Sequence, residues 1–303
     1  MKQPFATAEL QAELERALGF RLRSLRRLDG ASALNFRAER GSDGMVFAVK
    51  CSPAARQEMF DHLVEHLEVT AGTKAVRRLF AAECPARFRG FNLICLSWCA
   101  GERRFPDRLG EAELLDFLDD YRDFSTAMQR STLVAPVDPV LEWRGRSLAA
   151  VRGFWGRPVR ALIERELPVA DLTYVRERLR VVHGDFHHGN FLFTDGKVNG
   201  FFDLEEFCMG YPADDIVRYF VCAAEHLKWY ERHRLRRLRL RFAAAVRHLG
   251  YPRDEWTVAI NALLMRKLYK KTEGGCGLFQ ALNLCFRARF YRRLRLTVAA
   301  ILV

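Results

Sequence analysis

The sequence lacks several features that would each assign a simple class of protein. No run of 18 apolar residues occurs among the 303 residues, so no membrane-spanning helix is predicted. None of the eight cysteines forms a C-x-x-C pair, which argues against a zinc site and a disulfide framework. There are no internal repeats and no low-complexity linker. These absences favour a reduced, globular protein of one large domain or two lobes.

The composition predicts a large core and basic character. Half of the residues are hydrophobic and 12% are aromatic, so we do not expect disorder. The formal net charge of +12 favours anionic partners such as nucleotides, nucleic acid, acidic glycans or a membrane surface. Residues 1–20 have no long apolar core and predict a short helix rather than a signal peptide. We therefore expect a cytoplasmic location.

The pattern of predicted elements changes along the chain. Short extended runs occupy residues 20–51, a helix is expected around residues 56–80, and an apolar strand follows at 91–102. Beyond residue 110 the spacing is helical, at 111–130, 147–167 and 213–249. The sequence thus predicts an α+β protein with a small β-rich lobe and a larger, mostly helical lobe.

One short stretch, "VVHGDFHHGNFLFTDGKVNGFFDLEEF" at residues 181–207, interrupts the helical part. Asp-Gly between two apolar runs predicts a hairpin, with Asp185 and Asn190 before it and Asp203 after it. Oxygen-bearing side chains suit Mg²⁺, and a carboxylate that metal does not fully occupy can accept a proton from a hydroxyl group. This combination fits phosphoryl transfer.

The stretch also carries a family resemblance. H-G-D-x-x-x-x-N resembles the catalytic loop H-R-D-x-x-x-x-N of protein kinases, and with Gly in place of Arg it resembles the aminoglycoside phosphotransferase and choline kinase family. "DLE" at 203–205 and "GYPADD" at 210–215 match two further patterns of that family. The match is dense over residues 181–215 and looser over about 22–101. It implies a two-lobed, protein-kinase-like fold, with a nucleotide-binding lobe at 1–100 and the catalytic loop and acceptor helices at 101–303.

The resemblance implies a role for each matched polar residue. Asp185 would orient and deprotonate the acceptor hydroxyl, and Asn190 and Asp203 would hold Mg²⁺. Glu205 would contact the metal or the acceptor.

The remaining residues of this stretch would be structural. The resemblance makes His183 a structural member of the loop and lets Asp215 brace it from the next helix. A zinc interpretation also exists, because His187 and His188 lie near Asp185. It leaves the following Asn, the second Asp and the hairpin unexplained, so we favour the kinase interpretation.

The first lobe should then hold ATP. Lys50 in "FAVK" resembles the V-A-I-K lysine that pairs with the α- and β-phosphates. The preceding turn, "DGASALNF", is not G-x-G-x-x-G, but Gly30 and Ser32 stand where a phosphate loop is expected. Backbone groups near Trp98 and Cys99, at the end of the apolar strand, would contact adenine and form the hinge between the lobes.

Lys50 should also pair with a glutamate on the following helix. The candidates are Glu58, Glu65 and Glu68, and we favour Glu68 or Glu65. The spacing does not decide between them.

The sequence therefore predicts an ATP- and Mg²⁺-dependent kinase acting on a hydroxyl of a small molecule or glycan, such as a sugar, an amino alcohol, an aminoglycoside-like compound or a lipopolysaccharide-type sugar. Two alternatives remain: a kinase-shaped scaffold without activity, and an anionic-surface binder that uses the arginine-rich stretches 227–242 and 285–303. No nucleic-acid motif accompanies these arginines, so we expect no specific nucleic-acid partner, whereas a peripheral anionic membrane surface stays open. The sequence leaves the acceptor, the choice of ATP or GTP and the oligomeric state undetermined.

Overall fold

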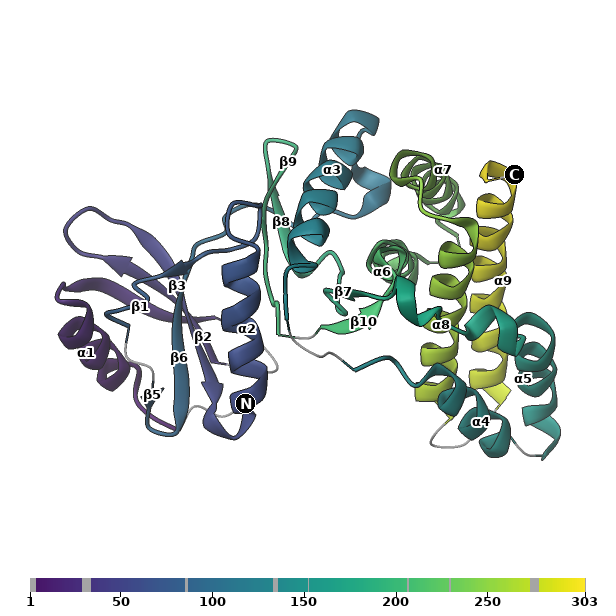
Figure 1. Cartoon of the computed structure of the whole chain (residues 1–303), viewed down its shortest axis with the longest axis horizontal. Coiled ribbons are helices and arrows are strands. Elements are labelled where there is room, and N and C mark those ends of the chain that lie inside the picture. The colour runs from purple at the N-terminus through teal and green to yellow at the C-terminus, as the bar shows by residue number, and fades with distance from the viewer. Residues whose placement is uncertain are drawn as a thin grey trace. The chain divides into compact units, whose positions relative to one another are not determined.

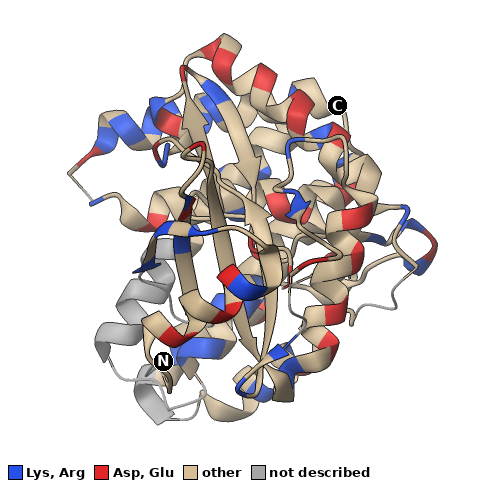
Figure 2. Ribbon diagram, turned by 90° about the vertical axis from the view of Figure 1, so that its left-hand side faces the viewer, with Lys and Arg blue, Asp and Glu red and all other residues tan. Residues whose placement is uncertain are grey.

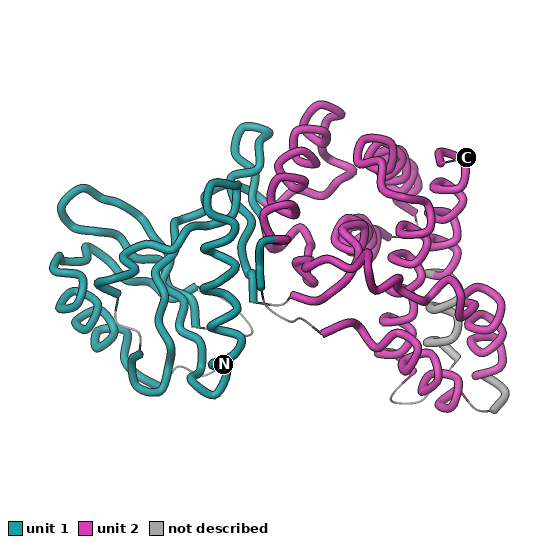
Figure 3. Tube along the Cα trace, in the orientation of Figure 1, with its two compact units in different colours: residues 1–102, 130–133, 191–206 teal, residues 103–129, 134–190, 207–303 magenta. Residues whose placement is uncertain are grey.

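The computed structural model describes residues 4–28, 34–84, 87–132, 136–151, 153–205, 207–228, 230–272 and 278–302. Gly30 and Ser32, expected in a phosphate loop, lie outside the described residues. The chain divides into two compact units (Figure 3). The β unit comprises residues 1–102, 130–133 and 191–206, and the helical unit comprises 103–129, 134–190 and 207–303. The chain therefore crosses between the units several times rather than once near residue 100.

The β unit is built on an antiparallel sheet with the strand order β1-β2-β3-β6-β4, with β5 also paired to β6 (Figure 1). Its helical elements and the strands of its sheet are α1 (Thr7–Leu18), β1 (Leu22–Leu28), β2 (Leu34–Arg40), β3 (Val46–Pro53), η1 (Ala54–Arg56), α2 (Gln57–Val69), β4 (Arg78–Leu79), β5 (Arg87–Phe88) and β6 (Phe91–Ser97). Lys50, on β3, lies opposite Asn35 on β2 and Ile94 on β6. It is thus held in the middle of the sheet.

Apolar residues on the sheet strands form the core of this unit. Phe36, Phe47 and Val49 are fully buried on β2 and β3, because alternate side chains of a strand point to the same face. The helix expected around residues 56–80 is shorter than predicted and ends at Val69. β-branched Val69 and Thr70 follow one another there, and the Thr70 hydroxyl donates to the carbonyl of His66.

The predicted hairpin is confirmed. β8 (Phe191–Thr194) and β9 (Lys197–Phe201) pair antiparallel around Asp195 and Gly196. Both turn residues have positive φ, at 51° and 78°, as a two-residue hairpin turn requires. The hairpin belongs to the β unit, where Phe201 also bridges to Ala75.

The helical unit packs helices around aromatic side chains. Its elements are η2 (Pro106–Arg108), α3 (Glu111–Met128), α4 (Val140–Ala150), α5 (Gly153–Glu166), η3 (Val169–Leu172), η4 (Arg176–Arg178), β7 (Arg180–Val182), β10 (Cys208–Gly210), α6 (Pro212–His226), α7 (Arg232–Leu249), α8 (Arg253–Thr272) and α9 (Leu278–Ile301). Phe117, Tyr121, Tyr219 and Trp256, from α3, α6 and α8, are all 1% exposed or less. Burying such rings stabilises the unit by roughly 2–3 kcal/mol each.

Two of the predicted helical stretches are confirmed as helical but are each divided into two helices. The helical stretch expected at 147–167 is divided between α4 and α5, since Val151 leaves the helical conformation with ψ at 77°. The helical stretch at 213–249 is likewise divided into α6 and α7.

The charge is unevenly distributed along the sequence. In the view of Figure 2, basic and acidic residues are interspersed. By contrast, the 232–249 and 278–301 segments that form α7 and α9 contain many arginines and no aspartate or glutamate. No helix in the described part of the chain is long and apolar enough to cross a membrane.

Candidate active site

In the helical unit, the Asp185 carboxylate is held between two nitrogen donors. Arg218, on α6, places Nη1 3.2 Å from Oδ1, and His187 places Nε2 3.3 Å from Oδ2. The Asp185 side chain is 31% exposed, whereas that of Arg218 is only 14% exposed. The carboxylate is therefore anchored from the buried side while part of it reaches the surface.

The tautomer of His187 follows from its hydrogen bonds. The backbone N–H of Gly189 donates to Nδ1 of His187 over 2.9 Å, so Nδ1 carries no proton. The proton of the ring is then on Nε2, which faces Asp185. A side chain at Gly189 would collide with this ring, since a Cβ there would lie 2.5 Å from Cε1 of His187. The loop sequence thus sets the direction of this hydrogen bond.

Asn190 closes the same loop. Its Nδ2 donates to the backbone carbonyl of Asp185 over 2.9 Å, and its own N–H donates to the carbonyl of His187. The residue is 6% exposed. The five-residue spacing of Asp185 and Asn190 is therefore the span of one closed loop.

Asp215, on α6, braces this loop from beneath. Its Oδ2 accepts from the backbone N–H of His183 over 2.9 Å, and its Oδ1 accepts from that of Gly184 over 3.1 Å. The Tyr121 hydroxyl also donates to Oδ2. Because α6 carries both Asp215 and Arg218, one helix positions the backbone of the loop and the carboxylate of Asp185.

The electrostatics of the loop keep Asp185 ionised. Burial acts to raise its pKa, but the hydrogen bond from His187 and the charge of Arg218 outweigh this effect, so the pKa is well below its ordinary range. Burial, with the nearby His226, lowers the pKa of His188 to about 4. The His188 ring packs against the Phe105 ring at a tilt of 41°, with ring centroids 4.2 Å apart. At neutral pH Asp185 is therefore a carboxylate and His188 an uncharged imidazole.

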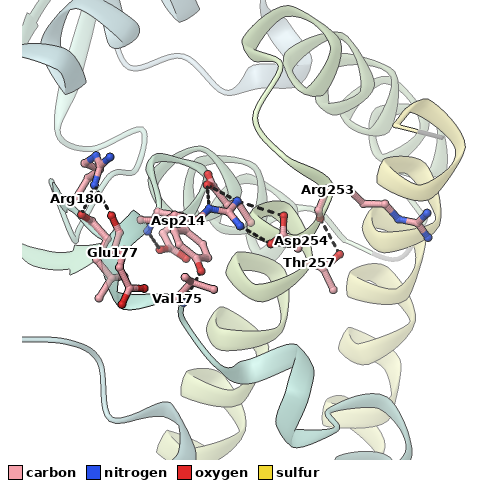
Figure 4. Close-up of polar contacts among 11 residues, drawn as sticks. Val175, Glu177, Arg180, Asp214, Arg253, Asp254 and Thr257 are labelled. Atoms are coloured by element: carbon pink, nitrogen blue, oxygen red, sulfur yellow. Dashed lines mark hydrogen bonds and ion pairs between the residues drawn. The ribbon is translucent and has the colours of Figure 1, made fainter.

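The segment leading into β7 is tied to α8 and α6. Arg178 forms a fork with Asp254 and Glu255, with contacts of 2.6 Å to each, and Figure 4 shows Asp254 from this cluster. Asp214, also labelled there, accepts from the Tyr174 hydroxyl over 3.0 Å. Burial raises the pKa of Asp214 to about 7. These contacts fix the strand that carries His183 into the loop.

A cavity of about 20 Å³ lies behind this loop. Gly184, Asp215 and Arg218 line it together with Asp138 and Arg266. Its volume suits about one water molecule. It is too small for an acceptor and is part of the support of the loop.

In the β unit, a second charged cluster surrounds Lys50. Its Nζ lies 2.7 Å from Oδ1 of Asp203 and also contacts Oε1 of Glu205. The side chains of Lys50 and Glu205 are 7% and 10% exposed, and that of Asp203 is 38% exposed. Lys50, which is distant in sequence from both carboxylates, thus forms one compact group with Asp203 and Glu205.

This arrangement differs from the expected pairing of Lys50 with Glu68 or Glu65. The Glu68 side chain is 67% exposed, and its Oε1 lies 4.0 Å from Arg78. Glu65 accepts from the Ser131 hydroxyl over 2.7 Å. The exposed Glu68 would gain little from an ion pair, and Glu65 already accepts from Ser131, whereas Glu205 is buried beside the Lys50 ammonium.

α2 contributes a histidine to the Lys50 group. The buried His66 donates from Nδ1 to the backbone carbonyl of Leu204 over 2.9 Å. This bond holds the segment between Asp203 and Glu205, and Asp203 itself has a left-handed φ of 65°. A non-glycine residue in this region costs about 1 kcal/mol or more, and it often marks a functional position.

Burial and charge act in opposite directions on this group. Burial acts to lower the pKa of Lys50, but the charges of Glu205 and Asp203 outweigh it and raise that pKa. Burial raises the pKa of Glu205, and its attraction to Lys50 only partly offsets this. The ammonium is therefore firmly charged, and removing it would leave a buried carboxyl without its counter-charge.

The two residues expected near adenine follow β6. The Arg37 guanidinium stacks over the Trp98 ring at 5.6 Å from its centroid. The Cys99 thiol lies 3.8 Å from the carbonyl of Gly200 on β9, and burial raises its pKa to about 11. Cys99 is thus an uncharged thiol packed against the hairpin.

The donor set of the Lys50 group fits a hard divalent cation. Carboxylate oxygens of Asp203 and Glu205 lie beside one another, and Oε2 of Glu205 is buried without a hydrogen-bond partner among the described residues. Such oxygens are the ligands that Mg²⁺ prefers. Across the described part of the chain, no group of three or more His, Cys, Asp or Glu residues is arranged to hold a metal ion. A cation here would therefore need oxygens from a ligand or water.

Sequence reasoning missed Arg218 and assigned His187 only to a zinc interpretation. A signal for Arg218 exists, because it lies three residues after Asp215 and thus on the same face of α6. The signal for His187 is its position between Asp185 and a glycine that allows close approach to the ring.

Solved structures share the fold of the chain. The aminoglycoside phosphotransferase of Alicyclobacillus acidocaldarius has a TM-score of 0.65 at 15% identity, with 99% of this chain and 96% of that chain covered. Amicoumacin kinase hAmiN, solved with AMP-PNP, Ca²⁺ and Ami, has a TM-score of 0.61 at 11% identity and 96% coverage of both chains. Spectinomycin phosphotransferase APH(9)-Ia, solved with ADP and spectinomycin, has a TM-score of 0.60 at 12% identity and 99% coverage of both. The chain therefore has the kinase-like fold of aminoglycoside phosphotransferases.

A match to a family profile assigns the chain to a protein family, which the shared fold alone does not do. The profile of the phosphotransferase enzyme family matches residues 23–257. No curated protein matches the chain by sequence. The chain belongs to the phosphotransferase enzyme family, and it is a kinase that transfers a phosphoryl group to a hydroxyl.

Proposed function

We propose that the protein transfers the γ-phosphoryl group of ATP, with Mg²⁺, to a hydroxyl of a small molecule or glycan. The observation that carries this proposal is the state of Asp185. It is an ionised, partly exposed carboxylate held on both oxygens in an H-G-D-x-x-x-x-N loop. Such a group can orient an acceptor hydroxyl and accept its proton as the new bond to phosphorus forms.

The nucleotide is assigned to the N-terminal part, residues 1–100, and the acceptor to residues 101–303. Lys50 would neutralise the α- and β-phosphates, since its pKa is raised and it is ammonium at neutral pH. Gly30 and Ser32 would supply backbone contacts to the phosphates, and the segment at Trp98 and Cys99 would hold adenine. Two of the solved relatives named above support this assignment in part, because one contains an ATP analogue and the other contains ADP.

Asp203 and Asn190 are the proposed ligands of Mg²⁺, as the sequence motif assigns them, with Glu205 as a further candidate. Bound there, Mg²⁺ would neutralise charge on the transferring phosphate. Asp203 is the most exposed carboxylate of its cluster, at 38%, and so is the one available to a metal–nucleotide complex. When the phosphates bind, Lys50 can exchange a carboxylate partner for a phosphate oxygen.

The acceptor is proposed to be a neutral or anionic hydroxyl compound, such as a sugar, a phosphosugar or a lipopolysaccharide-type glycan. The support is the net charge of +12, which disfavours a polycationic acceptor. The named relatives act on amicoumacin and spectinomycin, so antibiotics and amino alcohols belong in the same screen.

The first test is a thermal shift of the wild type and of Asp203→Ala, with ATP in the presence and absence of Mg²⁺. We expect a Mg²⁺-dependent rise in Tm for the wild type, since ligand at about 100 times its Kd adds about 2.7 kcal/mol of stability. The rise should vanish in Asp203→Ala. An ATP-consumption screen of sugars, phosphosugars, amino alcohols and aminoglycosides then identifies the acceptor.

The same experiment separates the proposal from a kinase-shaped scaffold. No shift at millimolar ATP with Mg²⁺ in the wild type would reject the nucleotide site. A normal shift with no turnover on any acceptor, in a protein whose Asp185→Asn variant behaves identically, would favour the scaffold. GTP tested in parallel decides the nucleotide preference.

A further inference from the structure

α7 and α9 pack against one another in the helical unit (Figure 1) and leave an open groove of about 460 Å³ along their contact. The residues that line the groove recur every three to four positions along α7 and along α9, as residues on one face of a helix do. One face of each helix therefore forms a wall of the groove. The groove is lined by Arg236, Arg239, Leu240, Ala243, Arg247, Arg293, Leu296, Thr297, Ala300 and Ile301. These faces differ from the buried ones, which hold Leu238 and Phe242 on α7 and Leu294 on α9.

The groove concentrates positive charge. No carboxylate is present among the described residues that line it. Arg236, Arg239, Arg247 and Arg293 have no ion pair within the described part of the chain, and Nε of Arg239 is buried without a hydrogen-bond partner there. The guanidinium groups of these arginines are therefore available to bind an anion.

Neighbouring arginines outside this face behave differently. Arg234 lies 2.7 Å from Asp107, and Arg295 lies 2.6 Å from Glu166. The same two helices thus pair some arginines with carboxylates, whereas the groove-facing ones have no ion pair with any described residue.

The groove also exposes large apolar side chains between these charges. Leu240 is 62% exposed and Leu296 is 60% exposed, each on the groove-facing side of its helix. A solvated basic face would gain nothing from these leucines, whereas a surface that meets both phosphate and hydrocarbon would.

We propose that this groove docks the protein on a membrane that contains anionic phospholipid. The four arginines would pair with lipid phosphates, and Leu240 and Leu296 would enter the boundary between headgroups and acyl chains. Single-stranded nucleic acid fits less well, because no aromatic side chain for base stacking is among the described lining residues. The inference goes beyond the proposed phosphoryl transfer and does not depend on it, since the groove requires no nucleotide.

The test is co-sedimentation of the full chain with vesicles of phosphatidylcholine, with or without phosphatidylglycerol, in the absence of nucleotide. We expect binding only to the anionic vesicles, and we expect it to weaken when NaCl is raised from about 0.1 to about 0.5 M. Arg239→Glu/Arg293→Glu should reduce the partition coefficient by at least about tenfold, since each arginine near such a surface contributes roughly fivefold. Leu240→Ser/Leu296→Ser should reduce it by about fivefold or more.

The matched control is Arg26→Glu/Arg237→Glu, which changes the net charge equally at two exposed arginines outside the groove. It should change partitioning by less than about twofold. An equal loss in the control, or no effect of the leucine changes, would overturn the groove in favour of diffuse attraction. Two other results would also reject the membrane-docking proposal. One is RNA binding that depends on the groove in a protein that does not bind vesicles, and the other is a dimer that depends on the groove in such a protein. If a double variant unfolds, the single substitutions Arg293→Glu and Leu296→Ser take its place, and each should still lower the partition coefficient relative to the control.

Discussion

The Lys50 cluster and the Asp185 cluster have opposite arrangements of charge. In the β unit one cation, Lys50, is shared by two carboxylates, and the group has an excess negative charge. In the helical unit one carboxylate, Asp185, is shared by a guanidinium and an imidazole N–H. The first arrangement can receive a divalent cation or exchange a carboxylate for phosphate, while the second keeps a carboxylate ionised and oriented. Each cluster can therefore be tested within its own unit.

The largest effect is expected for Asp185→Asn. Turnover should fall by about 10²–10⁴-fold, because the amide cannot accept the hydroxyl proton. ATP-induced thermal shift should stay at the wild-type value. Steady-state kinetics with an acceptor from the screen measures the loss. Asp195→Asn, at the hairpin turn where Asn also adopts positive φ, is the matched control and should keep full activity. A fully active Asp185→Asn enzyme would refute the role.

Next in size is Lys50→Met, which breaks the cluster of the β unit. Two carboxylates would lose their shared cation, and we expect a loss of about 2–4 kcal/mol in the free energy of unfolding, somewhat below a fully buried pair because Asp203 is part-exposed. Urea unfolding measures it. Lys74→Met changes an exposed lysine in the same unit and should cost less than about 0.5 kcal/mol. Equal stabilities of the two variants would show that the cluster contributes nothing.

Arg218→Met should act on the pH profile through Asp185. Arg218 helps to lower the pKa of Asp185, so its removal raises that pKa, and the loss of activity on acidification should begin at a higher pH. At neutral pH we expect kcat to fall by roughly tenfold with little change in KM. Arg218→Lys retains a charge and should restore part of the profile. An unshifted acid limb in Arg218→Met would assign the arginine a purely structural role.

A smaller effect is expected from His188. Its pKa in the folded protein is about 4, below the ordinary value near 6.5, so the unfolded chain binds more protons between these pH values. Stability from this group is therefore complete above pH 6.5 and declines as the pH falls toward 4. Because the side chain is only partly buried, we expect a decline of about 1 kcal/mol. His188→Gln should flatten Tm against pH in this window, and an unchanged slope would contradict the assignment.

The smallest effect separates the two glutamate positions. Glu68→Gln should change ATP affinity by less than about twofold, because an exposed pair at 4.0 Å contributes little. Glu205→Gln, which alters a buried partner of Lys50, should change it by more. Titration with a fluorescent ATP analogue compares the two, and a larger effect of Glu68→Gln would restore the helix glutamate as the partner of Lys50.

Local patterns in the sequence were sufficient for much of the fold. The run "LNFRAER" is β2 and "EAELLDFLDDYRDFSTAM" is α3, because periodicity of apolar residues directly determines which face is buried. Asp195 and Gly196 specified their hairpin turn for the same local reason. The prediction of a helix at 56–80 was wrong at its C-terminal end. There, β-branched residues and the pairing of β4 with β6 outweigh the helical spacing of the apolar residues.

The sequence by itself determined the loop that holds Asp185 and Asn190, since both residues belong to one closed turn of a few residues. Only the tertiary structure decided their partners. Arg218 lies 33 residues from Asp185, and Asp203 and Glu205 lie 153 and 155 residues from Lys50. The same holds for the groove of α7 and α9, whose walls are two separate helices. The physical reason is that spacing along a chain sets which face a side chain occupies, whereas its neighbours across space depend on how buried faces pack together.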